Sequence, residues 1–176
     1  MATGPQSPQT LSGMFEIKPM MAADTAAGYA ELEQQLRALL GGERDYTANA
    51  ANTAALLFHT LPGLNWAGFY RLAGETLVIG PFQGKPACVR IPLGQGVCGT
   101  AAARRTTVRV PNCRAFPGHI ACDPASKSEI VLPLLAQGRL VGMLDLDSPV
   151  LSRFSAADQT GLERLAAAFV AATDFE

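Results

Sequence analysis

The central part of the chain constrains the fold most, because it is a series of short apolar runs separated by glycine and proline. Runs of about four to eight residues bounded in this way predict β-strands. Tight turns between successive runs favour a largely antiparallel sheet. We expect strands at Trp66–Arg71, Thr76–Pro81, Ala87–Ile91, Thr107–Val110, Glu129–Leu135 and Arg139–Leu146.

Helical patterns flank these strands at both ends of the chain. Apolar residues from Tyr29 to Leu40 recur with the 3.6-residue period of a helix, and Gly41-Gly42 follows as a stop signal. Ser155 and Asp158 have the spacing of a capping-box variant at the start of the last helix. Helices from both ends would cover one face of the sheet, so the expected fold class is α+β. We expect helices over residues 23–40, 45–61 and 96–104, and from residue 155 onward.

A long loop is expected between the last two groups of strands. Residues 111–127 contain three prolines, one glycine and no periodic pattern. Loops longer than about 12–15 residues in a compact domain are commonly lids or binding loops. We expect this loop to roof the face of the sheet that the terminal helices leave open, with a ligand pocket beneath it.

Length, charge and hydropathy limit the domain organisation and the partners. The chain of 176 residues suits one domain, and we expect a flexible tail over residues 1–14 and a folded domain over residues 15–176. The net charge of −1 supplies no basic surface, so we expect no nucleic-acid partner. The sequence shows neither a membrane-spanning run of about 18 apolar residues nor a secretory signal. We therefore expect a cytoplasmic protein with reduced thiols and no association with membranes.

The four cysteines, Cys88, Cys98, Cys113 and Cys122, then call for an explanation other than a structural disulfide framework. No Cys-x-x-Cys pair is present, which disfavours a structural zinc site, although His119 three residues before Cys122 leaves a Cys–His metal site open. Cys88 lies within an expected apolar strand, where a cysteine is most often a small buried hydrophobe. Cys122 lies in the polar loop near Lys127, a setting that favours a reactive thiolate, and it is our candidate nucleophile.

Three carboxylates form a second candidate group. Alternation along the last expected strand places Val141, Met143, Asp145 and Asp147 on one face, and Glu129 opens the neighbouring strand. Two interpretations remain open from this pattern. The acids are either solvated strand ends, or they form a site for a cationic ligand group with one proton-donating carboxyl of raised pKa.

Seven segments, taken together, carry a resemblance to a known family over roughly residues 16–170. They are Asn65–Tyr70, Gly80–Cys88, Gly94–Gly99, Phe116–Asp123, Glu129–Pro133, Gly142–Pro149 and Phe154–Glu163. They resemble the free methionine-(R)-sulfoxide reductases, which are single GAF domains that act on the free amino acid. The N-terminal extension and the extra cysteine, Cys113, depart from that family pattern.

The resemblance implies roles for individual residues. Cys88, Cys98 and Cys122 would be the redox residues, with Cys122 as nucleophile, Cys88 as the residue that resolves the sulfenic acid and Cys98 as a second resolving candidate. The pocket would be lined by Trp66, Tyr70, Glu129, Asp145 and Asp147. Tryptophan and tyrosine in such a strand are otherwise most often core residues.

The expected activity is the reduction of free L-methionine (R)-S-oxide through a sulfenic acid on Cys122 and an intramolecular disulfide. Thioredoxin would recycle the disulfide. Glu129 would supply the proton and, with the two aspartates, bind the substrate ammonium, and we expect no cofactor and no metal. A GAF domain that only binds a small molecule as a sensor is the alternative. A homodimer is compatible with the sequence, which does not by itself give the oligomeric state.

Overall fold

The computed structural model describes Ile17, Met20 and residues 26–120 and 122–175. The flexible tail expected over residues 1–14 lies outside the described residues, and so does the start of the first expected helix at residues 23–25. Within the described residues, no helix is both long and apolar enough to cross a bilayer.

The core of the fold is a six-stranded sheet in the order β3-β2-β1-β6-β5-β4, in which every neighbouring pair is antiparallel. The expected antiparallel sheet is therefore confirmed. Two central strands, β6 and β1, carry most of the pocket-facing side chains described below. The strands are β1 Trp66–Ala73, β2 Thr76–Gly84, β3 Arg90–Pro92, β4 Val108–Val110, β5 Ser128–Ala136 and β6 Arg139–Ser148.

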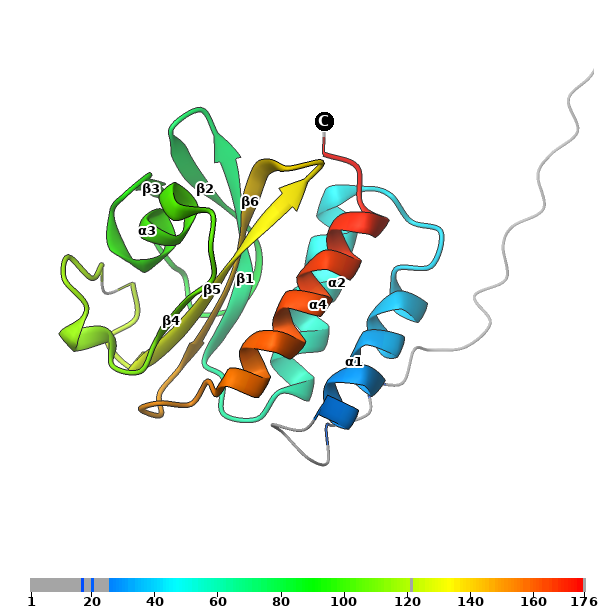
Figure 1. Ribbon diagram of the computed structural model, residues 1–176, viewed down its shortest axis with the longest axis horizontal. Helices are drawn as coiled ribbons and strands as arrows, with labels where there is room; N and C mark the ends of the chain where they lie inside the picture. Colours follow the sequence, from blue (N-terminus) through cyan, green and yellow to red (C-terminus); the bar gives the residue numbers. More distant parts are fainter. Residues whose placement is uncertain (1–16, 18–19, 21–25, 121, 176) are drawn as a thin grey trace, which may run out of the picture.

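Two helices lie against one face of this sheet, a third helix packs on the outer side of these two, and a fourth helix lies on the other face (Figure 1). The layered α+β arrangement with terminal helices on one side matches the expected fold class. Asp45 caps one helix by accepting from the Ala48 amide, and Ser155 and Asp158 form the expected capping box. The helices are α1 Ala26–Leu39, α2 Tyr46–Thr60, α3 Gly96–Arg104 and α4 Ala156–Ala172, with a short 3-10 helix η1 at Cys113–Ala115.

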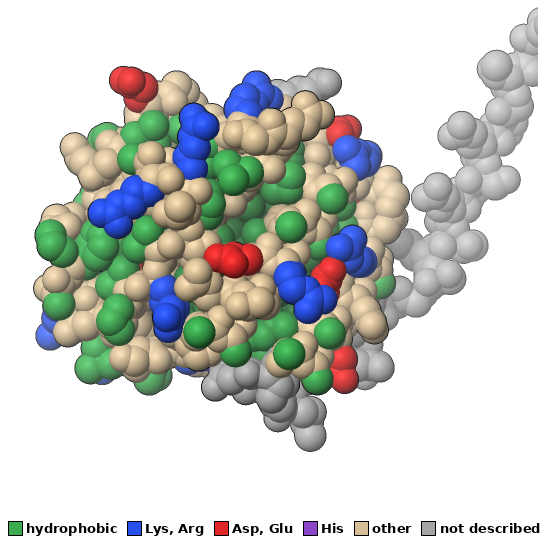
Figure 2. Space-filling view, in the orientation of Figure 1, with side chains coloured by type: hydrophobic (Ala, Val, Ile, Leu, Met, Phe, Trp, Pro, Cys, Tyr) green, Lys and Arg blue, Asp and Glu red, His purple; other side chains and the backbone are tan. Residues whose placement is uncertain are grey.

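Two apolar clusters lie on the two faces of the sheet. The larger one packs β1, β5 and β6 against α1, α2 and α4, and Phe69, Leu132 and Phe169 are at its centre. The smaller one lies between the sheet and α3 and includes Trp66 and Tyr70. On the side of the molecule shown in Figure 2, Lys and Arg side chains are scattered singly and do not merge into a stripe.

Two sequence-based expectations were wrong in detail. Strand β3 is only Arg90–Pro92, so Cys88 lies in the loop between β2 and β3 and not inside an apolar strand. The proline and glycine content of residues 84–86 explains this, because it ends β2 before Cys88 is reached.

The expected alternation along β6 is the second point. Val141 packs with the apolar cluster on the side of α1, α2 and α4, whereas Met143 belongs to the cluster on the other face of the sheet. The register between β5 and β6 skips Val141, and this bulge interrupts the simple alternation.

Helix α1 is joined to α4 by a buried tyrosine. The Tyr29 hydroxyl donates to Asp158 Oδ1 over 2.6 Å, and the Tyr29 ring packs directly on Gly161 of α4. A Cβ atom built on Gly161 would lie 2.1 Å from the ring, far inside contact distance. Gly161 is therefore needed for the close approach of the two helices.

We expect Gly161→Ala to destabilise the protein, although alanine favours a helix over glycine by about 1 kcal/mol. Overpacking a close contact of this kind costs about 1–3 kcal/mol, which outweighs the gain in propensity. Chemical denaturation at equilibrium should show the loss. The matched control is Thr160→Ala at the neighbouring exposed position of α4, which should change stability little. A Gly161→Ala variant more stable than the wild type would contradict this packing argument.

Candidate functional site

The site is built on a row of side chains that runs across three strands. Trp66 of β1 lies opposite Asp147 of β6, and Asp147 lies opposite Glu129 of β5. Residues directly opposite in neighbouring strands share a face of the sheet. Asp145, two residues before Asp147, lies on the same face. The antiparallel register therefore brings the tryptophan and all three predicted acids together.

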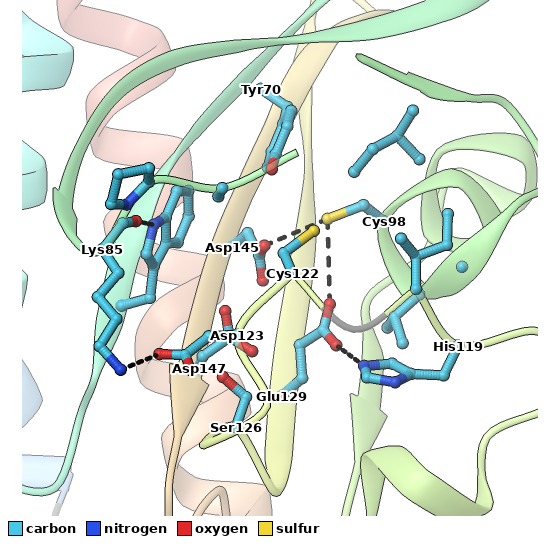
Figure 3. A pocket seen from close by; sticks show the side chains of 17 residues that line it. Tyr70, Lys85, Cys98, His119, Cys122, Asp123, Ser126, Glu129, Asp145 and Asp147 are labelled. Atoms are coloured by element: carbon cyan, nitrogen blue, oxygen red, sulfur yellow. Dashed lines mark hydrogen bonds and ion pairs between the residues drawn. The ribbon is translucent and has the colours of Figure 1, made fainter. Parts of the chain in front are cut away.

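These side chains line one pocket between the sheet, α3 and the loop over residues 111–127 (Figure 3). The pocket is a small cavity with a volume of about 40 Å³. Every predicted site residue except Cys88 contributes to its wall. The predicted residues in the wall are Trp66, Tyr70, Cys98, Cys122, Glu129, Asp145 and Asp147.

A disulfide closes one side of this pocket. Cys88, in the loop after β2, is bonded to Cys122 in the long loop, with 5.6 Å between their Cα atoms. Two loops that are 34 residues apart in sequence are thereby joined covalently over the sheet. Cys122 consequently offers no free thiolate in this state, so the Cys–His metal pair of His119 and Cys122 considered from the sequence is not available here.

Two of the three acids are buried and Asp147 is half-buried, so the interpretation of them as solvated strand ends is wrong. Glu129 and Asp145 are each only 6% exposed. Burial, reinforced by the neighbouring carboxylates, raises the pKa of both groups well above the ordinary range. Burial also raises the pKa of Asp147 to about 7, although a hydrogen bond from the Ser126 hydroxyl opposes the shift. At neutral pH the cluster therefore retains protons that ordinary carboxyls would have lost.

One oxygen in this cluster is available to a ligand. Asp145 Oδ2 faces the thiol of Cys98 at 3.3 Å, but its Oδ1 is buried and has no hydrogen-bond partner within the described part of the chain. A buried polar atom without a partner costs free energy. A ligand that donates a hydrogen bond at this point would remove that cost.

The two free cysteines lie on either side of Glu129. Cys98 Sγ is 4.0 Å from Glu129 Oε1, and Cys113 Sγ is 3.9 Å from Glu129 Oε2. Burial, together with the surrounding carboxylates, raises the pKa of the Cys98 thiol. The same causes raise the pKa of Cys113 to about 12. Both cysteines are therefore held as neutral thiols at physiological pH.

The aromatic side chains of Trp66 and Tyr70 form another wall of the pocket. The Trp66 ring stacks on Phe82 with 5.4 Å between centroids and on Tyr70 with 6.0 Å. The indole N–H donates to the Lys85 carbonyl, and the Tyr70 hydroxyl donates to the Cys88 carbonyl. These two bonds fix the rings and also tie down the loop that carries Cys88.

Sequence reasoning missed a polar group at the pocket rim. Asp123 forms an ion pair with Lys85 at 3.5 Å and accepts from the Asn65 side chain. Asn65 also donates to Ser126 over 3.0 Å. No periodicity or motif spacing predicts these contacts, because all four residues lie outside regular elements. The available signal was the resemblance, because Asn65, Lys85 and Asp123 lie within the segments that carry it.

Comparisons with known proteins show the family of this chain. The GAF domain family matches residues 21–172. The free methionine-R-sulfoxide reductase of Escherichia coli is 52% identical over 151 residues, and the match covers 84% of this chain and 92% of that protein. The chain belongs to the free methionine-(R)-sulfoxide reductase family of GAF domains.

Two further relatives extend the likeness to yeast and to a solved complex. The free methionine-R-sulfoxide reductase of Saccharomyces cerevisiae is 44% identical over 146 residues, covering 77% of this chain and 81% of that protein. The structure of the reductase from Neisseria meningitidis in complex with its substrate has a TM-score of 0.85 and 43% identity. That match covers 90% of this chain and 95% of the other. The family resemblance inferred from the sequence is confirmed.

For this family member, two groups of side chains have the composition of a metal site. One consists of Cys98, Glu129 and Asp145, and the other consists of Cys113, His119 and Glu129. In each group the potential ligand atoms lie within 4.8 Å of one another. His119, half-buried beside Glu129 at 3.8 Å, has a pKa lowered by burial. It is therefore a neutral imidazole near pH 7, which is the form that can bind a metal.

The buried acids predict an unusual dependence of stability on pH. The pKa of Asp147 in the folded protein, about 7, lies above its ordinary value of 3.8. The folded state therefore holds more protons than the unfolded state between these two values, and stability is lost as the pH rises through about 7. We expect the free energy of unfolding of the disulfide-bonded, ligand-free protein to fall between about pH 5 and about pH 8.

Asp147→Asn should flatten this pH dependence by an amount on the order of 2–3 kcal/mol. Denaturant titrations at a series of pH values measure the slope directly. Glu31→Gln, at an exposed position of α1, should keep the wild-type slope. A wild-type stability that rises over this interval would contradict the assignment of protonated acids.

Proposed function

We propose that this protein reduces free L-methionine (R)-S-oxide to L-methionine with the Cys88–Cys122 pair, and that thioredoxin recycles the pair. The observation that carries the proposal is a disulfide at the edge of a small pocket whose floor holds three carboxyl groups, two of them buried and one half-buried. A thiol pair and a proton-holding acid in one cavity are the two requirements of thiol-dependent sulfoxide reduction. The names of the relatives in E. coli and yeast support the same substrate.

The pocket suits both ends of this substrate. Asp147 and the unpartnered oxygen of Asp145 provide negative charge and an acceptor for the substrate ammonium. The rings of Trp66 and Tyr70 provide an apolar wall for the S-methyl group. The small enclosed space under the roof loop favours a free amino acid, because a polypeptide would need an exit for its chain at each end.

The proposed chemistry has two steps on the protein. The Cys122 thiolate attacks the sulfoxide sulfur while Glu129 gives its proton to the sulfoxide oxygen. The resulting hydroxyl group then moves from the substrate sulfur to the Cys122 sulfur as the bond between the two sulfur atoms breaks, which releases methionine and leaves a sulfenic acid on Cys122. The Cys88 thiol then condenses with this sulfenic acid, which forms the disulfide and releases water. A dithiol of thioredoxin reduces the disulfide by exchange, so one methionine is formed for each thioredoxin oxidised.

The surroundings of the cysteines favour Cys122 over Cys98 as the nucleophile. Cys98 is fully enclosed, with its sulfur 3.3 Å from Asp145 and 4.0 Å from Glu129. Ionising a thiol beside carboxyl groups is unfavourable, and its pKa is raised accordingly. Cys122 is half-buried on the roof and already bonded to its resolving partner. Cys98 is then a thiol that orders the acids, which leaves Cys88 as the resolving residue.

The proposal places the protein in the cytoplasm, where thioredoxin-type reductants keep such a pair cycling. A non-catalytic sensor would bind methionine or its oxide without consuming the thiols. Mixing the fully reduced protein with methionine (R)-sulfoxide separates these functions. The reductase should release one methionine per chain and lose two thiols, as read by chromatography and thiol titration, whereas a sensor should do neither.

We expect Cys122→Ser to abolish methionine release in a single turnover, because no sulfenic acid can form. Cys88→Ser should still release about one methionine per site and then stall for want of a resolving thiol. Rapid-quench assays on the reduced variants, with and without thioredoxin, measure both effects. Normal turnover of Cys88→Ser with thioredoxin would assign the resolving role to Cys98, and methionine release by Cys122→Ser would overturn the nucleophile assignment.

Glu129→Gln should slow the single-turnover sulfoxide step by about 10²–10⁴-fold, the usual contribution of a positioned proton donor. Glutamine keeps the size of the side chain, so the fold should be unchanged by circular dichroism. The matched control is Glu75→Gln at the exposed turn between β1 and β2, which should react at the wild-type rate. An unchanged rate in Glu129→Gln would show that another group supplies the proton.

A further inference from the structure

Cys113 is buried next to the site without lining the pocket, and the proposed reduction makes no use of it. It is 0% exposed, and its sulfur lies behind Glu129, 3.9 Å from Oε2. On another side of the same oxygen lies His119 Nε2, at 3.8 Å. A thiol, an imidazole and a carboxylate from three separate segments thus converge on one point.

The backbone holds these three side chains in place. The Cys113 amide donates to the Lys127 carbonyl over 2.8 Å, which ties η1 to the start of β5. The His119 amide donates to the Phe116 carbonyl in a turn, and Glu129 is paired within the sheet to Asp147 and Val110. The backbone therefore holds the three ligand atoms within 4.8 Å of one another, and only small movements of the side chains are needed to bind one ion.

We propose that Cys113, His119 and Glu129 form a binding site for a zinc-type divalent cation. Sulfur, imidazole nitrogen and carboxylate oxygen are the donors that Zn²⁺ takes in proteins. Tetrahedral zinc bonds of about 2.0–2.3 Å place neighbouring donors about 3.4–3.6 Å apart. The observed separations of 3.8 and 3.9 Å need to shrink by only a few tenths of an ångström.

The rest of the pocket favours a cation at this point. Glu129 Oε1, Cys98 Sγ and the unpartnered Asp145 Oδ1 all lie on the pocket side of the triad. The fourth coordination position is left for water from the pocket. The neutral imidazole binds directly, and the carboxyl group of Glu129 and the thiol of Cys113 each release a proton to solvent as the metal binds.

The consequence for function follows if the proposed reduction is correct. A cation on Glu129 occupies the carboxyl group that is to give its proton to the sulfoxide oxygen. The metal-bound protein would then be inactive, and the site would make sulfoxide reduction sensitive to free zinc. The metal site itself does not depend on that activity, so the two proposals can be tested separately.

Binding is measured on the disulfide-bonded, substrate-free protein, where Cys88 and Cys122 offer no thiols. Competition with a chromophoric zinc chelator should give one zinc per chain, and Co²⁺ should produce a sulfur-to-metal charge-transfer band. Cys113→Ser should lose the band. Both Cys113→Ser and His119→Asn should bind zinc at least about 10–100-fold more weakly, the loss already seen when only an outer-shell partner of a metal ligand is removed.

His119→Asn should keep the charge-transfer band, and it serves as the second variant if Cys113→Ser fails to fold. The matched control is His59→Asn on α2, which should bind zinc like the wild type. Failure of the wild type to bind zinc would overturn the proposal. A Cys113→Ser protein that keeps the band, or a His119→Asn protein with wild-type affinity, would overturn it as well.

A second experiment compares the turnover of methionine sulfoxide with and without zinc. Cys113→Ser should keep wild-type turnover in the absence of metal and resist inhibition by zinc, whereas the wild type should be inhibited. Equal inhibition of both proteins would overturn the link between this site and activity. If neither protein reduces methionine sulfoxide, the reductase proposal fails, and the binding experiments still decide on the metal site.

Discussion

The crowding of three carboxyl groups on one face of the sheet, two of them buried and one half-buried, is the constraint on which the rest of the site depends. Glu129 and Asp145 are almost completely enclosed, and their mutual repulsion opposes ionisation of the whole group. The sheet register enforces this proximity, since Glu129 and Asp147 are direct cross-strand partners. The arrangement costs stability in the ligand-free protein and creates a pocket whose acids retain protons.

The cysteines fall into two groups that differ in their distance from these carboxyl groups. Cys98 and Cys113 face the carboxyl groups and are held as neutral thiols, whereas Cys122 sits on the roof loop and is bonded to Cys88. Cysteine is therefore found here in two chemical states, a neutral thiol and a disulfide, in different surroundings. The disulfide also joins the loop after β2 to the loop that roofs the pocket, so the proposed redox pair lies at the edge of the pocket.

Much of this organisation is present in the linear pattern. Short apolar runs bounded by glycine and proline predicted the antiparallel sheet, and the Ser155–Asp158 spacing predicted the start of α4. Strand alternation placed Asp145 and Asp147 on one face. These features are local, since each depends on residues that are close in sequence and on the period of one element. Errors arose where a longer-range effect intervened, as with the bulge at Val141.

The sequence by itself determined the fold class, the family and the candidate residues, because periodicity and motifs depend on residues that are close together in the sequence. Only the tertiary structure decided that the acids are buried and that Cys113 lies behind Glu129. It alone also brought Lys85 to Asp123 at the rim. Burial and ion pairing depend on contacts between loops and strands far apart in the chain. The spacing of residues along the sequence does not predict which loop covers which face of the sheet.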